Sequence, residues 1–485
     1  MAISIKLQPQ ELTPVYNEVI LVLDSTKKTE PLFNYVVDIN IGGVYSSQMK
    51  VETNPDGYGV LDMHKHLESS VSFNIDHTST TITKRALDSF IEYDVVLKEQ
   101  YLFTVDYFTV TNVGGFTRFF YGTPHYLEVG DYVTQSASGG GAYDGDYLVT
   151  AVNDPTTITT NQTFVGATTG TTTRADGAAT IISGGTVMTG TTYAFNGVLP
   201  WLDVPNWDFN NYVPGNGGQE LFLTTIPAVS SVRVEDRIWL NFYNSITNNA
   251  TYLKVVSNQG TFRILNPYPT TSTSNKLLSV GVGPWNINNT TSTVITDSGA
   301  LPIIGSGTTS YTVQLTTAGF PSPSTPSYTA STETLTFNVD RRCSKFENYK
   351  LMYLDRFGSF LTVNFDLAHK KSVKVNKSDY KANYGTYNST TNTWGYNSWD
   401  RGKSRLDTDI SDTYTIKSNW VNEDTGGQII ELMESPEVYH LKADGTLLAI
   451  NITTSSLEEK QQLNEKIFNY ELGFEYSFKN TVQRG

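Results

Sequence analysis

Strict alternation of apolar and polar side chains near the C-terminus is the feature that most constrains the fold. Tyr470, Leu472, Phe474, Tyr476 and Phe478 alternate with small or polar residues. Successive side chains of a strand point to opposite faces, so this period of two predicts a strand with one aromatic, half-buried face. No sequence motif typical of catalysis lies near this stretch. The segment therefore favours a structural part of a sheet over a catalytic element.

Composition extends this interpretation to the whole chain of 485 residues. Apolar residues make up 38% and charged residues 17%, with 29 Tyr, 23 Phe and 38 Gly. Aromatic and β-branched residues suit half-buried pleated surfaces, whereas strong helix formers are concentrated in a few short stretches. The length is typical of roughly three domains. We predict a mostly β protein with several β-sandwich-like domains in tandem, a small β insertion and few short helices.

Turn signals and shifts in composition suggest where the domains divide. Runs of strand-like sequence separated by Gly, Pro and Asn predict the units, and a Thr/Gly-rich stretch marks the insertion, which could equally be a disordered linker. The predicted units are an N-terminal β-sandwich over 1–95, a β segment over 96–192 with the small β insertion at about 130–190, a second sandwich over 193–340, and a C-terminal β domain over 341–485 with a short helix near 456–467.

Charge and cysteine content exclude some functions. The formal net charge of -14 disfavours general binding to phosphate backbones, so we expect no direct nucleic-acid binding. The lone Cys343 has no partner for an internal disulfide, which suits a reducing cytoplasm. The N-terminus does not resemble a secretory signal, and no apolar run approaches the roughly 20 residues that cross a bilayer. We expect no membrane association.

Few residues have the spacing that catalysis or metal binding requires. His64 and His66 could share a strand face and hold a metal, although we favour two solvated histidines. Cys343 follows Arg341 and Arg342, whose charges could lower its pKa, but we favour a buried structural thiol. We therefore expect no catalytic residue, no cofactor and no metal.

Aromatic residues gather in the segment from Trp394 to Asp400, which includes Tyr396 and Trp399. Sugars stack on such rings, and Asp400 with a distant carboxylate such as Glu431 or Glu434 could hydrolyse glycosides. Tyr and Trp are also enriched where proteins meet. We favour an interface loop, followed by a glycan-binding loop, and then by a glycosidase.

Positive charge gathers a little earlier in the chain than this aromatic segment. Five lysines lie within twelve residues there, and Asp379 is the one acidic residue among them. These lysines could face an acidic neighbouring subunit, including another copy of the chain. We favour the alternative, a solvated strand and turn. The residues are Lys370, Lys371, Lys374, Lys377 and Lys381.

Several runs outside the insertion resemble one protein family. They are Phe33–Ile39, Asn54–Asp62, Tyr193–Gly197, Ile238–Leu240, Leu351–Gly358, Ile452–Ser456 and the aromatic strand at 470–478. In these runs the chain resembles virion proteins of tailed bacteriophages that infect Bacteroidota, including the crAss-like group. None of the runs contains a chemical mechanism, and the insertion does not fit the pattern.

The resemblance implies a structural part of a phage tail, neck collar or baseplate, present in many copies as a ring. Its partners would be copies of itself and other tail, portal or neck proteins. It would be assembled in the host cytoplasm and located in the virion. Two alternatives stay open: a receptor- or glycan-binding tail adhesin that uses the Trp394 to Trp399 loop, and a tail-spike depolymerase.

Overall fold

The computed structural model confirms a mostly β protein made of several sheets with few short helices. It describes residues 3–102, 104–136, 139–174, 180–188, 190–215, 219–245, 250–269, 272–319, 327–455 and 467–478. The short helix predicted near 456–467 lies outside the described residues except for position 467, which begins a strand.

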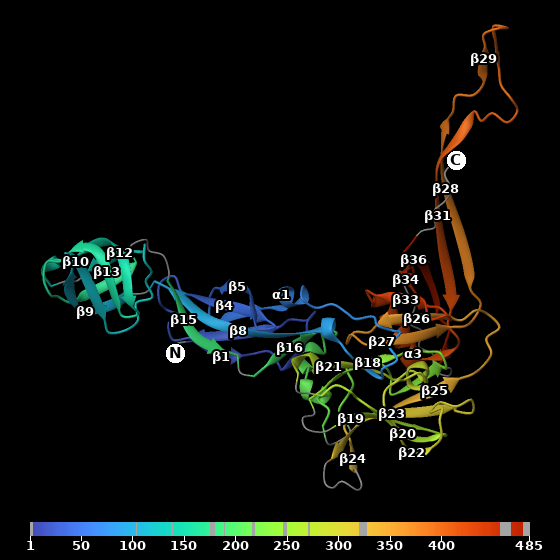
Figure 1. The fold of residues 1–485 in the computed structure, drawn as a ribbon, viewed down its shortest axis with the longest axis horizontal. Helices are drawn as coiled ribbons and strands as arrows, with labels where there is room; N and C mark the ends of the chain where they lie inside the picture. Colours follow the sequence, from blue (N-terminus) through green and yellow to red (C-terminus); the bar gives the residue numbers. More distant parts are fainter. Residues whose placement is uncertain are drawn as a thin grey trace. The chain divides into compact units, whose positions relative to one another are not determined.

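The chain forms two compact units that are discontinuous in sequence (Figure 1). Unit 1 comprises Met1–Ser72 and Phe90–Phe209, and unit 2 comprises Phe73–Ser89 and Asn210–Gly485. These limits differ from the predicted boundaries at 95, 192 and 340. The physical reason is long-range strand pairing, because the strand at 192–195 pairs with the strand at 90–101, and the strand at 83–85 pairs with the strand at 277–281.

Unit 1 contains a two-layer sandwich whose layers meet through alternating apolar residues. Leu21 and Leu23 from one sheet pack with Val37, Val95 and Leu97 from the other. The first sheet has the order β1 (Ile3–Leu7), β3 (Ile20–Ser25), β6 (Gly59–Asp62). The second has the order β2 (Leu12–Pro14), β16 (Thr192–Phe195), β8 (Phe90–Tyr101), β4 (Asn34–Ile41), β5 (Val44–Val51), with β15 (Thr180–Val187) also paired to β8.

The predicted insertion is part of a closed barrel within unit 1. Its interior is filled by aromatic and β-branched residues such as Tyr107, Phe119 and Ile158. The strand order is β10 (Phe116–Tyr121), β13 (Thr157–Thr163), β12 (Gly145–Asp154), β11 (Tyr132–Ser136), β14 (Gly170–Arg174), β9 (Thr104–Val113). The Thr-rich sequence of β13 and β14 is therefore ordered sheet, and the alternative of a disordered linker is wrong for these strands.

Unit 2 is built on two sheets. The smaller has the order β17 (Val229–Arg233), β25 (Leu335–Asp340), β23 (Ser310–Gly319), β19 (Thr251–Ser257), β20 (Gly260–Leu265), β22 (Val294–Gly299), with β24 (Ser327–Ala330) paired to β23. The larger has the order β28 (Lys370–Lys381), β31 (Lys403–Lys417), β36 (Glu471–Tyr476), β34 (Leu447–Ile452), β33 (Val438–Leu441), β26 (Tyr349–Leu354), β27 (Phe360–Phe365), β18 (Trp239–Tyr243), β21 (Leu277–Gly281), β7 (Thr83–Arg85).

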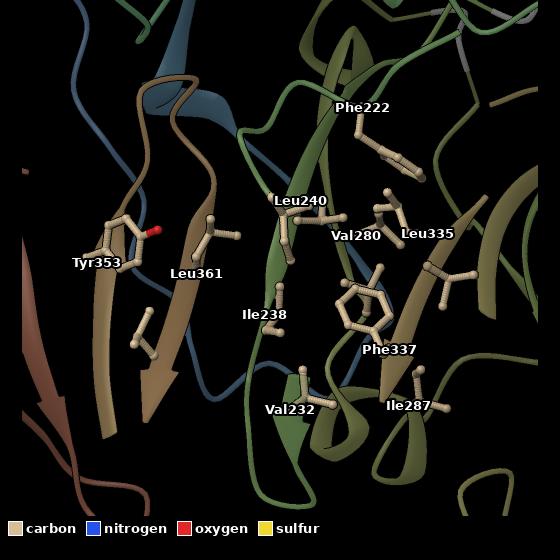
Figure 2. Close-up of a cluster of buried hydrophobic side chains, with 14 of the residues drawn as sticks. Phe222, Val232, Ile238, Leu240, Val280, Ile287, Leu335, Phe337, Tyr353 and Leu361 are labelled. Carbon is tan, nitrogen blue, oxygen red and sulfur yellow. The ribbon is translucent and has the colours of Figure 1, made fainter. Parts of the chain in front are cut away.

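The main core of unit 2 lies between side chains of these two sheets, as Figure 2 shows. Leu240 and Val280 project from the larger sheet toward Leu335 and Phe337 of the smaller. Strands β26 and β27 form a hairpin, pairing with each other across the turn after Leu354.

The remaining elements are short. The described helices are α1 (His64–Glu68), α2 (Pro284–Asn288) and α3 (Glu423–Glu434), and the two-stranded ladders are β29 (Thr386–Asn388) with β30 (Thr393–Gly395) and β32 (Val421–Asn422) with β35 (Ile467–Phe468). The 3₁₀ turns are η1 (Leu87–Ser89), η2 (Gly139–Gly141), η3 (Val204–Asn206), η4 (Phe209–Tyr212) and η5 (Thr273–Asn275). Of the described helices, α3 is the longest at 12 residues, and none could span a membrane.

The predicted C-terminal strand exists, but its aromatic face is shorter than expected. Leu472 and Phe474 are fully buried in β36, whereas Phe478 is 87% exposed. The reason is that ladder pairing stops at Tyr476, opposite Ile450, so Phe478 lies past the end of the strand.

Candidate functional site

Two long strands of the ten-stranded sheet form an exposed arm, defined here as residues 370–417 (Figure 1, orange). Strands β28 and β31 pair from Lys370 opposite Thr415 to Lys381 opposite Lys403. The neighbour β36 pairs with β31 only over 413–417, so ten residues of β31 continue past it. At about 3.3 Å per residue, this projecting part is about 30 Å long.

Residues 382–402, called the tip, close the end of the arm. Strands β29 and β30 form a small hairpin in which Tyr387 faces Trp394, and Asn392 supplies the positive φ that the turn needs. The Tyr387 hydroxyl donates a hydrogen bond to Asn392 Oδ1. A side chain at Gly385 would strike the Trp394 ring, because its Cβ would lie 2.8 Å away. The tip is therefore a locally specified structure.

The predicted aromatic residues lie together at this tip, largely open to solvent. Trp394 is 61%, Tyr396 70% and Trp399 77% exposed within the chain. Tyr384 packs edge-on against Tyr396 with ring centroids 5.6 Å apart. Exposed apolar groups gathered in this way mark interaction sites more often than single scattered ones.

The predicted lysines all lie on β28, where alternation divides them between two faces. Lys371, Lys377 and Lys381 share one face, and Lys370 and Lys374 share the other. Sequence reasoning missed that β31 brings acidic residues close to them, such as Asp412, which lies opposite Val373 and diagonal to Lys371. Lys371 pairs with Asp412 at 2.7 Å, and the hydrogen bond that its ammonium donates to this carboxylate raises the pKa of Lys371.

Asp379, the acidic residue predicted to stand against the lysines, is instead engaged by β31. It accepts Lys403 at 3.2 Å and Arg405 at 2.6 Å. Those hydrogen bonds lower the pKa of Asp379. Among the described residues, Lys374, Lys377 and Lys381 form no ion pair. The positive patch is therefore smaller than the sequence indicated, but it has cations free to bind a partner.

A pocket of about 350 Å³ lies at the base of the arm. It occupies the notch that forms because β36 ends while β31 and β34 continue on either side. Ile410, Tyr414, Leu448 and Tyr476 share the same face of these strands and line it. Sequence reasoning missed this pocket, although the alternation of Leu406, Thr408, Ile410, Asp412, Tyr414 and Ile416 along 406–416 could have predicted the strand.

A cluster of aromatic rings packs around Tyr414 and Tyr476, two residues that line the pocket. Tyr414 stacks on Phe474 with centroids 5.1 Å apart, and Tyr349 stacks on His440 at 5.0 Å. A hydrogen bond of 2.8 Å joins His440 Nδ1 to the Tyr476 hydroxyl. Burial lowers the pKa of His440 to about 4, so the imidazole is neutral at pH 7.

This buried histidine predicts a loss of stability in acid. Its folded pKa lies below the ordinary value of about 6.5, so its contribution is complete above pH 6.5 and is lost as the pH falls toward 4. We expect the advantage of the wild type over His440→Gln in free energy of unfolding to shrink by about 1 to 2 kcal/mol between pH 7.5 and pH 5. Urea titrations at the two pH values measure this change.

The matched control for that titration is His369→Gln, which removes an exposed imidazole from the same unit. An equal pH-dependent change in both variants would contradict the role assigned to burial of His440.

The other histidine and cysteine candidates do not form a site. His64 and His66 lie on the short helix α1, not on a strand, and bind different partners: Asp62 at 2.6 Å for His64 and two serines for His66. No group of three metal-ligating side chains exists among the described residues. Cys343 is exposed, so the prediction of a buried thiol is wrong; it lies in the connection between β25 and β26, outside either strand.

The suggested glycosidase carboxylates are far apart. Asp400 lies at the tip, where Oδ2 accepts the Asn397 amide at 2.8 Å. Glu431 and Glu434 lie on α3, in the body of unit 2, and Glu434 pairs with Arg356 at 2.6 Å. The length of the arm, about 30 Å, greatly exceeds the separation of about 5 to 9.5 Å that glycoside hydrolysis uses.

Asp355 and Glu431 form a buried pair of carboxylates that sequence reasoning missed, and Thr225 bridges the two. The Thr225 amide donates to Asp355 Oδ2 at 3.1 Å, and its hydroxyl donates to Glu431 Oε2 at 2.6 Å. Burial and the charge of Glu431 raise the pKa of Asp355, and burial raises that of Glu431. Both side chains are less than 10% exposed and hydrogen-bonded within the protein, so the arrangement is structural.

A second pocket, of about 270 Å³, lies beside the exposed Trp420. Its charged groups already pair with one another: Arg233 with Asp366 at 2.5 Å and Arg342 with Asp340 at 2.9 Å. These ion pairs stabilise the packing around the pocket, and they leave few polar groups free to bind a ligand.

Comparisons with known proteins identify no family for this chain. No family model and no curated protein matches it. Among solved structures it is similar to the phage phi92 endosialidase, with 10% sequence identity and a TM-score of 0.15, over 99% of this chain and 68% of the other. A TM-score this low does not establish a shared fold.

Proposed function

We propose that the chain is a non-enzymatic structural protein of a phage tail, neck collar or baseplate, and that it assembles with copies of itself and with other tail, portal or neck proteins in the virion. The observation that carries the proposal is the arm, a two-stranded projection with an aromatic tip. The resemblance of several sequence runs to phage virion proteins supplies the setting.

An arm of this kind suits assembly. A two-stranded ribbon that buries few side chains gains little stability from its own packing. The conformational entropy lost in ordering it is therefore offset when a partner covers it. The few residues that dominate the binding energy of protein interfaces are enriched in Trp, Tyr and Arg. The tip presents several of them together, at the position on the chain best able to reach a neighbour.

Charge further favours a copy of the same chain as partner. Nine of the 34 lysines and arginines but only five of the 48 acidic residues lie within 370–417. The rest of the chain therefore holds 25 positive against 43 negative side chains. A basic arm and an acidic body attract each other between molecules. A ring closes when each copy offers two different complementary surfaces, and arm and body are such a pair.

Glycan binding is the second candidate, because the exposed rings of Trp394, Tyr396 and Trp399 could also stack on sugars. A depolymerase has less support, given the separation of Asp400 from Glu431. A strictly monomeric chain that binds glycans through the tip would favour the adhesin.

The test is the mass of the full chain in solution, followed by electron microscopy of any ring. We expect Trp399→Ala to weaken association by at least about 30-fold, the effect of losing a central aromatic contact. Trp201→Ala is the matched control, because Trp201 is 79% and Trp399 77% exposed in the chain. A monomeric wild type, or equal effects of the two substitutions, would contradict the proposal.

A further inference from the structure

We propose that the pocket at the base of the arm is a socket for the aromatic tip of a second copy's arm. This inference rests on the proposed assembly and names the surface that receives the arm. The socket is the notch lined by Ile410, Asp412, Tyr414, Leu448 and Tyr476.

The notch is suited to an aromatic side chain. It is about 350 Å³ in volume, room for one or two rings. Its walls are the rings of Tyr414 and Tyr476 and the aliphatic side chains of Ile410 and Leu448. Aromatic pairs gain from edge-on and offset contacts beyond the area that they bury. An incoming indole would therefore meet both apolar walls and rings.

Three of the polar residues that line the notch, Lys371, Asp412 and Tyr476, already have partners, whereas Glu475, which also lines it, has no ion pair among the described residues. Lys371 binds Asp412 at 2.7 Å, and its ammonium lies 5.3 Å from the Tyr414 ring. The Tyr476 hydroxyl is hydrogen-bonded to His440. Desolvating unpaired polar groups is the usual cost of filling a pocket, and at these three residues that cost is small.

The tip that fills the socket comes from another molecule. Nine residues of strand, 403–411, separate Asp412 from the tip in the same chain, about 30 Å of ribbon. The ladder between β28 and β31 continues from Lys371 to Lys381, so the arm does not fold back on its own base. Tip and socket are thus different surfaces of one chain, which makes the contact head-to-tail and able to propagate around a ring.

A mixing experiment tests the contact. One variant, Trp394→Ala with Trp399→Ala, lacks the tip rings, and another, Ile410→Lys, blocks the socket at a half-exposed position on the arm. Each alone is expected to associate at least about 30-fold more weakly than wild type. Mixed in equal amounts, they are expected to form a heterodimer and nothing larger, because each pair retains one intact tip and one intact socket.

Leu448→Lys provides a second socket variant on another strand, and circular dichroism checks that each variant is folded. A mixture that stays monomeric while wild type assembles would overturn the socket but not the assembly. Folded variants that assemble like wild type would also overturn the socket but not the assembly. A wild type that is monomeric, or that captures glycans through the tip instead, would overturn both.

Cross-linking gives an independent readout. In a Cys343→Ser background, which removes the exposed natural thiol, chains with Ser398→Cys, beside Trp399, and chains with Ala449→Cys, at the edge of the socket, are mixed and oxidised. We expect a disulfide-linked heterodimer from this pair, and none when Trp201→Cys replaces Ser398→Cys. Equal yields from the two mixtures would contradict the proposal.

Discussion

Replacing Phe474 with alanine is expected to lower the free energy of unfolding of unit 2 by about 4 kcal/mol, the usual cost of removing a buried phenylalanine ring. Phe474 is fully buried in β36 and contacts the rings of Tyr414, Tyr349 and Tyr476 at centroid distances of 5.1, 5.9 and 5.6 Å. Its loss leaves a cavity between the arm and the body. Urea denaturation followed by circular dichroism measures the change.

The matched control is Phe478→Ala, four residues along the same segment. Phe478 is 87% exposed, so its truncation should change the free energy of unfolding by less than about 0.5 kcal/mol. Similar losses in the two variants would show that the end of the chain does not pack as described.

Asp355→Asn is expected to destabilise unit 2 by about 3 kcal/mol near pH 5. Asp355 Oδ1 accepts the amides of Phe357 at 2.9 Å and Ser359 at 2.7 Å, and Oδ2 accepts Thr225 N at 3.1 Å and the Thr224 hydroxyl at 2.7 Å. An asparagine offers one acceptor oxygen and turns an amino group toward donors on the other side. A buried amide without a partner costs about 1 to 3 kcal/mol.

The pH dependence of this variant has a definite sign. Burial and Glu431 raise the folded pKa of Asp355 above its ordinary value near 3.8, and this outweighs the hydrogen bonds that it accepts, which lower the pKa, so the wild type is more stable in acid than at neutral pH. That contribution is complete below about pH 4 and is lost as the pH rises through the folded pKa. The deficit of Asp355→Asn should therefore shrink from pH 5 to pH 8 in urea titrations.

The control for this prediction is Asp407→Asn, at an exposed position of the arm. It should change stability by less than about 0.5 kcal/mol at both pH values. A deficit of Asp355→Asn that grows with pH would contradict the pKa direction.

Local features of the fold were predictable from sequence, because their signals lie within a few residues of each other. The hairpin of β26 and β27 follows from alternation on both sides of the turn at Asp355 to Gly358. The aromatic tip follows from neighbours at 394–399. Partners distant in sequence were not predictable: nothing in Thr83–Arg85 specifies that β7 pairs with β21, nearly 200 residues later.

In the candidate site, too, the local features were predictable from sequence and the contacts between distant segments were not. The lysines of β28 could be identified from the sequence, but the ion pair of Lys371 with Asp412 depends on a ladder that places Asp412 opposite Val373, two residues along β28. The socket depends on three strands ending at different points along one sheet. Strand lengths of this kind are decided by pairing across the sheet, which propensity and periodicity do not contain.

Residues 73–89 belong to unit 2 although the segments on either side belong to unit 1, and this determines the order in which the chain can fold during synthesis. Unit 1 has all its residues once position 209 has left the ribosome, yet β7 must then wait for β21, at 277–281, before it finds a hydrogen-bonding neighbour. An open strand edge invites pairing with the wrong chain, and short length and basic residues blunt that risk. With three residues, two of them Lys84 and Arg85, β7 has both protections during this interval.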